Sequence, residues 1–300
     1  MPQSSPPRFD TISFLTDYGT SDEFVGVVKS VIRQIAPHAA VIDITHDIAP
    51  YDTKAASLTL ARSVQYLCPG VVLAVVDPGV GTQRRAVAIE VGDGQSYLVG
   101  PDNGMLASAV GMVGGATAAV ELTNPEYQLA APGPTFAGRD IFGPAAAHLC
   151  AGVPLEALGD PVDTSSLLPG IIPLPREEGG ALVAEVLWVD RYGNCQLNVD
   201  PDEVVVWGDR IQLKWVRPRE QARTATRVRT FDDLGPGQVG LVTDSYGLLA
   251  VAVHRGSAAE TLGLAAGDEI HLIRLDDGAD DRATGPSVPV ALGTRTQRPS

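Results

Sequence analysis

Three segments in the first half of the chain combine a carboxylate with turn-forming residues directly after an apolar run. They are Thr16-Asp17-Tyr18-Gly19, Asp43-Ile44-Thr45-His46-Asp47 and Asp77-Pro78-Gly79-Val80-Gly81. A carboxylate placed there can accept hydrogen bonds, hold a cation or take up a proton. These segments are therefore the first candidates for binding or catalysis.

Asp77 is the most informative of these carboxylates because it follows six consecutive apolar residues, 71–76. Such a run predicts a buried strand that delivers the carboxylate into poorly solvated surroundings, and Gly79 and Gly81 let bare backbone approach a ligand. Arg84, seven residues after Asp77, can return to the carboxylate and keep it ionised. A helix cap or a loop-stabilising ion pair is the structural alternative.

Other kinds of chemistry find less support. Asp43, His46 and Asp47 are metal-ligand types, but their spacing matches no specific metal signature. No GxxxxGK[ST] occurs, no GxGxxG joins a strand to a helix, and no GxSxG surrounds a serine. We therefore expect no metal, no nucleotide cofactor and no serine nucleophile.

A fourth turn of interest, Asp190-Arg191-Tyr192-Gly193-Asn194, lies in the second half. An aromatic ring can stack on a purine, and an asparagine amide offers a donor and an acceptor to the purine edge. An ordinary hairpin turn with Gly-Asn explains the same residues.

The elements that position the first three segments alternate in period. Apolar runs predict strands at 11–15, 40–44 and 71–76, and helical spacing predicts helices at 23–35 and 53–66. This β-α-β-α-β order indicates a mainly parallel sheet covered by helices on both faces. Ligands bind beyond the carboxyl ends of the strands in such sheets, where the three carboxylates stand. Further strands are predicted at 85–91 and 96–100, and further helices at 105–110 and 141–150.

After a stretch rich in Pro and Gly, the sequence pattern changes from alternating strands and helices to short strands. We predict an N-terminal α/β domain at 9–165, a linker at 166–180, a C-terminal β-barrel-like domain at 181–275 and a disordered tail at 276–300. The short strands of the second domain are predicted at 182–189, 195–199, 210–216, 239–243 and 248–253.

The composition of the chain argues against some classes of binding partner. The formal net charge of −14 argues against a nucleic-acid surface, because binding phosphates needs clustered Lys and Arg. No uncharged apolar run reaches about 18 residues, so we expect no membrane span. The N-terminus shows no secretion signal, and three cysteines without metal-ligand spacing fit a reducing compartment. A cytoplasmic protein with a small-molecule substrate is expected.

Seven motifs in order along residues 10–270 resemble one family. They are LTDYGT (15–20), DITHDIAPYD (43–52), VVDPGVGTQRR (75–85), GPDNG (100–104), TFAGRDIF (135–142), DRYGN (190–194) and DSYG (244–247). They are similar to the S-adenosylmethionine hydrolases, or hydroxide adenosyltransferases, which are relatives of the fluorinase and chlorinase enzymes. The resemblance implies an N-terminal α/β domain, a C-terminal β-barrel-like domain, and a homotrimer with active sites between subunits.

The resemblance also implies roles for single residues. Asp17 would bind the ribose hydroxyls, with Tyr51 near the nucleoside. Tyr192 would stack on adenine and Asn194 would recognise its edge. Asp190, with Asp22, would bind the methionine ammonium, while Ser245 and the Tyr246 backbone would hold the methionine carboxylate.

An Asp-Arg-His set that activates water distinguishes the hydrolases of this family. Asp77 and Arg84 match the first two members, and Arg85 is a close rival of Arg84. The third member does not match, because Ala137 stands where the family usually has histidine. Either Asp77 and Arg84 suffice, or another group or a water fills the gap, or the activity is weakened.

The implied reaction is hydrolysis of S-adenosyl-L-methionine to adenosine and L-methionine by in-line attack of an activated water on C5′, without a cofactor. One alternative is a halide-dependent synthase of 5′-halo-adenosine. A carboxylate at position 77 opposes it, since a fixed negative charge repels halide. A second alternative is a protein that binds S-adenosylmethionine or adenosine without turnover, which the alanine at position 137 favours.

Overall fold

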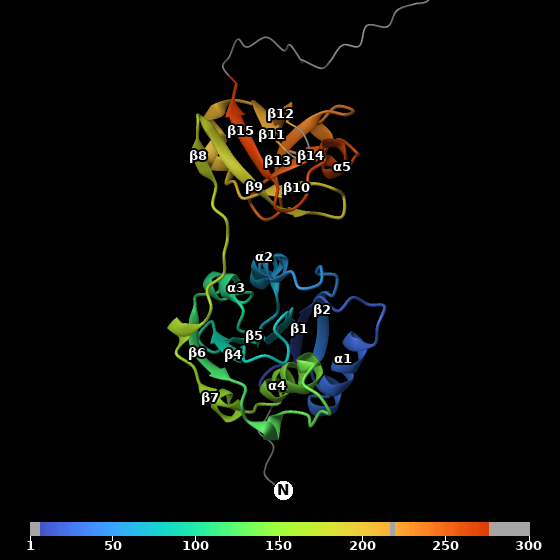
Figure 1. Ribbon diagram of the computed structural model, residues 1–300, viewed down its shortest axis with the longest axis vertical. Coiled ribbons are helices and arrows are strands. Elements are labelled where there is room, and N and C mark those ends of the chain that lie inside the picture. Colours follow the sequence, from blue (N-terminus) through green and yellow to red (C-terminus); the bar gives the residue numbers. More distant parts are fainter. Residues whose placement is uncertain (1–6, 217–219, 276–300) are drawn as a thin grey trace, which may run out of the picture.

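The computed structural model describes residues 7–216 and 220–275. It shows an α/β domain and a β-barrel that are joined by an extended segment, residues 162–175, which we call the strap (Figure 1). The predicted tail at 276–300 lies outside the described residues. Among the described residues, no helix is long and apolar enough to cross a membrane.

The first domain contains one mixed sheet of seven strands. The strand order is β2 (Ala40–Thr45), β1 (Thr11–Thr16), β3 (Val71–Val75), β5 (Ser96–Pro101), β4 (Ala86–Val91), β6 (Ala116–Glu121) and β7 (Asp160–Pro161). Strands β2, β1, β3 and β5 are parallel, and β4 is antiparallel to both its neighbours. Because β1 and β3 are adjacent and parallel, Asp17 and Asp77 follow neighbouring strand ends at the same edge of the sheet.

Helices cover both faces of this sheet. Along β3, Val71, Leu73 and Val75 face the cluster that contains α1 (Phe24–Ile35) and α4 (Gly143–Cys150). The alternate residues, with Val76 beyond the strand, face the cluster that contains α2 (Thr53–Ser63) and α3 (Ala107–Met112). This period-two alternation between two buried faces explains the continuous apolar run before Asp77.

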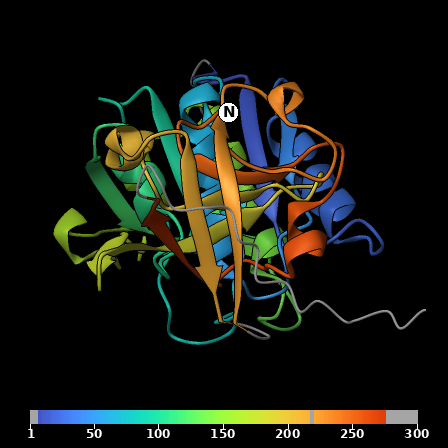
Figure 2. The same ribbon diagram turned by 90° about the horizontal axis from the view of Figure 1, so that it is seen from above.

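The second domain is a closed seven-stranded barrel, which Figure 2 shows from above. Its strands are β9 (Ala181–Val189), β10 (Cys195–Leu197), β14 (Leu249–Val253), β13 (Val239–Thr243), β12 (Gln221–Val228), β11 (Arg210–Trp215) and β15 (Glu269–Arg274). Strand β10 pairs with both β14 and β9, which closes the ring and removes free strand edges. Strand β8 (Arg176–Glu178) pairs with β9 outside the ring, and helix α5 (Ala258–Leu262) packs against β14.

The two domains contact each other through α2 and β9. Lys54 of α2 forms an ion pair with Glu185 of β9. The guanidinium of Arg62 stacks on the Trp188 ring, 4.2 Å from its centroid. These contacts hold the barrel against the α2 face of the first domain.

The predicted fold class, an α/β domain followed by a β-barrel-like domain, is confirmed. Five strands were not predicted, namely β6, β7, β8, β12 and β15. Strand β6 reads ATAAVE and β12 reads QARTATRV, so neither carries the β-branched apolar run that signals a strand. Strand β12 therefore depends on its place in the barrel and not on its local sequence. Ala225 is the one residue of this strand that is fully buried in the core.

Candidate active site

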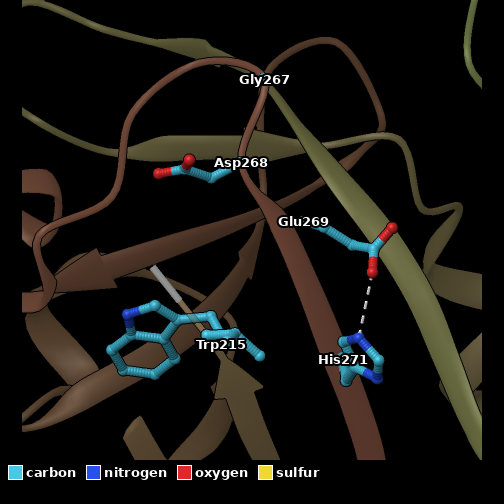
Figure 3. A pocket seen from close by; sticks show the side chains of 6 residues that line it. Trp215, Gly267, Asp268, Glu269 and His271 are labelled. Atoms are coloured by element: carbon cyan, nitrogen blue, oxygen red, sulfur yellow. Dashed lines mark hydrogen bonds and ion pairs between the residues drawn. The ribbon is translucent and has the colours of Figure 1, made fainter. Parts of the chain in front are cut away.

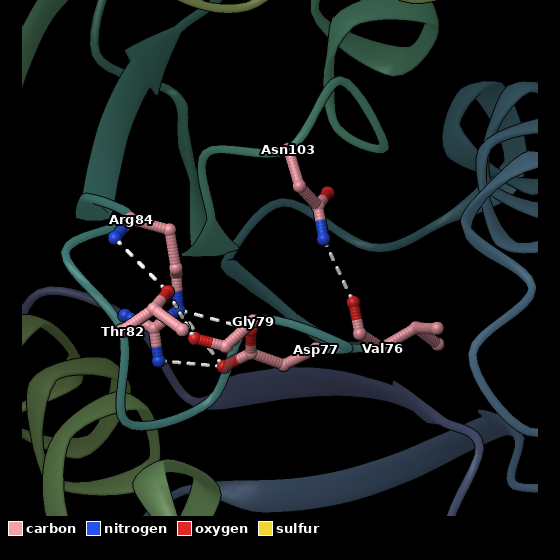
Figure 4. A network of polar contacts seen from close by, with 6 residues as sticks. All are labelled: Val76, Asp77, Gly79, Thr82, Arg84 and Asn103. Atoms are coloured by element: carbon pink, nitrogen blue, oxygen red, sulfur yellow. Dashed lines mark hydrogen bonds and ion pairs between the residues drawn. The ribbon is translucent and has the colours of Figure 1, made fainter.

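Asp77 follows β3, and its side chain is only 6% exposed. Arg84 donates from Nε to both carboxylate oxygens, at 2.9 and 3.0 Å, and from Nη2 to Oδ2 at 2.5 Å (Figure 4). Charge-assisted hydrogen bonds of this kind favour the ionised carboxylate. The connecting loop is closed by its own bonds, including one from the Thr82 hydroxyl to the Gly79 carbonyl at 2.7 Å.

The end of β3 has a second support that the sequence did not reveal. Asn103 donates from Nδ2 to the carbonyl of Val76 at 2.9 Å, while its Oδ1 accepts from the amide of Met105 at 3.2 Å (Figure 4). Asn103 thereby ties the residue before Asp77 to the turn that begins α3. Its place in the GPDNG motif was the available signal, but a turn residue is also expected there on local grounds.

The two neighbouring arginines bind different carboxylates. Arg85 donates from Nε to Asp102 Oδ2 at 2.9 Å, and its guanidinium also contacts Ser166. Asp102 in turn accepts from the amide of Leu168 at 2.9 Å. The structure therefore places Arg84 on Asp77 and assigns Arg85 to a connection between the sheet and the strap. The catalytic role of Arg84 stays a prediction.

Asp17 is held by a residue in an unusual backbone conformation. Its Oδ2 accepts from the amide of Tyr51 at 2.9 Å. Tyr51 has φ of 69°, in the left-handed region that non-glycine residues rarely adopt, and its ring is 72% exposed. The arrangement brings together two residues predicted to surround the nucleoside. Asp22, predicted to help bind the ammonium, is exposed in the loop before α1.

Tyr18 is a polar group of this site that sequence reasoning did not single out. Its ring packs against Phe24 and Phe136, and its hydroxyl lies so close to Gly138 that a Cβ at that position would stand 2.3 Å from it. Burial, reinforced by the charges of Asp17 and Asp77, raises the pKa of Tyr18 well above its usual value. The hydroxyl therefore keeps its proton and can act as a donor.

Ala137 presents a methyl group to a hollow of about 440 Å³. Arg84, Thr82 and Asp140 also line this hollow, and Asp140 is paired with Arg139 at 2.6 Å. A single π-helical turn, Gly138–Phe142, follows Ala137 and leads into α4. The hollow thus offers space beside the Asp77–Arg84 pair, at the position where the motif resemblance implies a histidine.

On the barrel, the turn 190–194 stabilises itself. The carboxylate of Asp190 accepts from the amides of Tyr192 and Asn194 and from Asn194 Nδ2, each at 2.8 Å. The Tyr192 ring is 78% exposed. Asp190 and Asn194, predicted to bind different parts of the substrate, therefore bind each other in this structure.

The turn 244–247 is built in the same way. Asp244 Oδ1 accepts from the amides of Tyr246 and Leu248, at 2.8 and 3.1 Å. Ser245 is exposed, and the Tyr246 ring meets Trp188 edge-on with centroids 6.4 Å apart. Within the described part of one chain, no hydrogen bond or ion pair joins these two turns to Asp17 or Asp77.

Two further observations concern other kinds of site. Within residues 7–216 and 220–275, no group of three or more His, Cys, Asp and Glu side chains is arranged to hold a metal ion. A separate hollow of about 330 Å³ lies on the barrel, where His271 Nε2 is 3.2 Å from Glu269 Oε1 (Figure 3). None of the predicted site residues lines it.

An α/β sheet with a buried carboxylate–arginine pair at its carboxyl edge, followed by a closed barrel, defines a two-domain enzyme. The model of the SAM hydroxide adenosyltransferase N-terminal domain matches residues 12–159, and that of the corresponding C-terminal domain matches residues 184–271. The chain belongs to the SAM hydroxide adenosyltransferase family.

Individual relatives agree with this assignment. The (R)-S-adenosyl-L-methionine hydrolase of Salinispora tropica is 45% identical over 261 residues, which cover 87% of this chain and 97% of the relative. A fluorinase of an Actinoplanes species is more distant, at 26% identity over 295 residues, with 89% and 97% covered. A solved structure of an uncharacterized conserved protein from Thermotoga maritima superposes with a TM-score of 0.80 at 37% identity, covering 88% of this chain and all of the other.

Proposed function

We propose that this chain hydrolyses S-adenosyl-L-methionine to adenosine and L-methionine. The observation that carries the proposal is the buried Asp77 carboxylate, which Arg84 holds at the carboxyl edge of the sheet. Three relatives that are 40–45% identical to this chain are named (R)-S-adenosyl-L-methionine hydrolases, which supports the same substrate and favours its (R) epimer at sulfur. No cofactor is required in this proposal.

The chemistry needs only a well-placed nucleophile. The sulfonium is a good leaving group, so water attacks C5′ as the C5′–S bond breaks and its electron pair returns to sulfur. A carboxylate can accept hydrogen bonds along about four lone-pair directions, and Arg84 donates three hydrogen bonds to Asp77. The remaining direction of Asp77 orients the water and accepts its proton as attack proceeds. Arg84 stabilises the hydroxide character that develops on the oxygen.

The same pair argues against the halide reaction. An ionised carboxylate repels a halide placed beside it, and its burial leaves less water to screen the repulsion. Asp77 therefore favours water as the nucleophile. A protein that binds without turnover is the other alternative, because Ala137 leaves the usual third group missing.

Purified protein incubated with each epimer of S-adenosylmethionine tests the reaction. We expect adenosine and methionine in equal amounts, faster from the (R) epimer, and an unchanged product when chloride or fluoride is added. Formation of 5′-halo-adenosine would contradict hydrolysis. Binding of the substrate without adenosine formation would identify a binding protein instead.

We further propose that the site is completed by a second copy of the chain in a homotrimer. The exposed turns 190–194 and 244–247 carry the predicted adenine and methionine ligands, yet no hydrogen bond or ion pair in the described part of one chain joins them to Asp17 or Asp77. Asp17 and Asp77 would then face the barrel of a neighbouring subunit. Free thiols at Cys68, Cys150 and Cys195 fit the reducing cytoplasm, which we propose as its location.

Mixing two variants, each defective in one half of the site, tests the shared site when activity is measured well below the KM of the wild type. Asp77→Asn removes the catalytic half and Tyr192→Ala the recognition half. If the site is shared, unfolding and refolding the variants together creates some sites with both halves intact, and activity returns to roughly a quarter of the wild-type value. A site built within one chain would give no recovery, and sedimentation of the wild type as a monomer would also exclude the trimer.

A further inference from the structure

A buried polar chain lies behind the turn that carries Asp17. His46 is 6% exposed, and Thr16 is fully buried. His46 Nδ1 lies 2.8 Å from the Thr16 hydroxyl oxygen, which accepts from the amide of Tyr18 at 3.2 Å. The His46 carbonyl accepts from the amide of Gly19 at 2.8 Å. Both residues that follow Asp17 are therefore held through His46.

Asp43 determines the direction of the hydrogen bonds in this group of buried polar residues. Its Oδ2 accepts from Lys29 Nζ at 2.6 Å, and its Oδ1 lies 3.1 Å from His46 Nε2. Burial opposes ionisation of Asp43, but the hydrogen bond from Lys29 and the contact with His46 outweigh it and lower the pKa of this carboxyl. The Nε2 contact is off the line of a good hydrogen bond, so its attraction is electrostatic.

The negative charge of Asp43 favours the imidazole tautomer with its proton on Nε2. Nδ1 then has a free lone pair and accepts a hydrogen bond from the Thr16 hydroxyl. The Thr16 oxygen in turn accepts from the Tyr18 amide. All donors point one way, from the turn after β1 towards β2.

The loop after β2 thus contacts the turn after β1 at two places. His46 holds Tyr18 and Gly19, while Tyr51 holds the Asp17 carboxylate itself through its backbone amide. These contacts restrain the backbone after Asp17 and one oxygen of its carboxylate. Its orientation is decided before a substrate arrives.

We propose that His46 is a positioning residue for Asp17: it acts through Thr16 and Gly19 to aim the Asp17 carboxylate at the ribose hydroxyls of the substrate. This inference rests on the proposed function, because the ligand of Asp17 comes from it. It also gives the Asp43–His46 pair a role other than metal binding. Lys29 occupies Asp43, and Thr16 occupies His46 Nδ1, so a cation has no open pair of ligands there.

The affinity of a nucleoside with ribose hydroxyls, relative to one without them, measures this role directly. Adenosine and 2′,3′-dideoxyadenosine serve as the probes, and calorimetry gives both dissociation constants. In the wild type we expect adenosine to bind about 30-fold more tightly, since a charged acceptor bonds two hydroxyls. Loss of general stability would weaken both ligands together, whereas misdirection of Asp17 lowers only the ratio.

Two pairs of variants provide matched controls. His46→Gln lacks an acceptor at the Nδ1 position, and Thr16→Val lacks the hydroxyl; each should lower the ratio at least fivefold. His46→Asn keeps an acceptor near Nδ1, and Thr16→Ser keeps the hydroxyl; each should stay within about twofold of the wild type. Circular dichroism verifies that each variant is folded, and Thr16→Val retains the test if His46→Gln does not fold.

Three results would overturn the proposal. The first is an unchanged ratio in folded His46→Gln and Thr16→Val proteins, which would make His46 merely structural. The second is a wild type that binds both nucleosides equally, and the third is one that binds neither at millimolar concentration. Adenosine formation by the wild type, measured in parallel, shows separately whether the proposed hydrolysis itself stands.

Discussion

The two halves of the candidate site differ in how far they are assembled within one chain. At the edge of the sheet, Asp77 is buried, paired with Arg84 and backed by Asn103. On the barrel, Asp190 accepts within its own turn, Asp244 accepts from its own turn and from Gln196, and Tyr192 is largely exposed.

This difference separates chemistry from recognition. A group that activates water gains from a rigid, poorly solvated position, because no reorganisation is then needed during the reaction. A ring that stacks on adenine needs only a stable turn and an open face, and burial comes with the ligand and the opposite wall. The sheet edge is therefore preorganised, while the barrel turns await a second surface.

Asp77→Asn attacks the preorganised half, and we expect the largest effect there. Turnover should fall by about 10²- to 10⁴-fold because the amide cannot accept the proton of water. Binding of S-adenosylmethionine should stay within about threefold. Adenosine formation and calorimetric affinity measure the two quantities.

Asp102→Asn is the matched control, since it breaks the neighbouring arginine–carboxylate pair. It should lower the thermal midpoint while the rate per folded molecule stays near that of the wild type. A similar loss of turnover in both variants would show that Asp77 acts through stability and not through chemistry.

Tyr192→Ala attacks the recognition half. Removing a stacking ring costs about 1–3 kcal/mol, which corresponds to roughly 5- to 150-fold weaker substrate binding, with kcat nearly unchanged. Tyr192→Phe keeps the stacking face and should bind like the wild type. A drop in kcat at saturating substrate would place Tyr192 in the chemical step instead.

Ala137→His adds an imidazole to the hollow beside Arg84. We expect kcat to rise by about tenfold, less than the roughly 10²- to 10⁴-fold of a fully positioned acid or base, because the surrounding groups are not arranged for the new imidazole. Ala137→Leu fills the same space without a polar group and should not raise the rate. An unchanged kcat in Ala137→His would mean that the site activates water without this group.

The cysteines report separately on the two domains and give the smallest expected effect. Cys68 is exposed, whereas burial raises the pKa of Cys150, in the first domain, and of Cys195, in the barrel, to about 12. A thiol reagent at pH 8 should modify Cys68 alone, and all three in denaturant. Mass spectrometry of partly denatured protein shows which domain opens first. Rapid modification of Cys150 or Cys195 in the native protein would contradict their burial.

Much of the fold could be predicted because the signal was local. The apolar run before Asp77 is buried on both faces of a parallel sheet, so its strand was evident from the sequence. Strand β12 was not, since its neighbours β11 and β13 create it from a polar segment. Local patterns carry little information about such pairing.

The site was predicted less evenly. Spacing favoured Arg84 over Arg85, and the structure places Arg84 on Asp77, but the roles given to the barrel residues stay predictions. Tyr18, Asn103 and His46 were not assigned to the site. Their contributions arise from contacts with residues 2 to about 120 positions away, which no single motif contains.

Because Arg84 and Arg85 pair with different carboxylates, the loop before β4 has to keep its length. Arg84 lies against Phe142 on one face of the sheet, while Arg85 reaches the strap on the other. Deleting one residue from 78–83 would bring Arg85 to Asp77 and pull Asp102 and the strap out of register. Protein engineers must therefore keep the number of residues in this loop, because that number decides which arginine meets which acid.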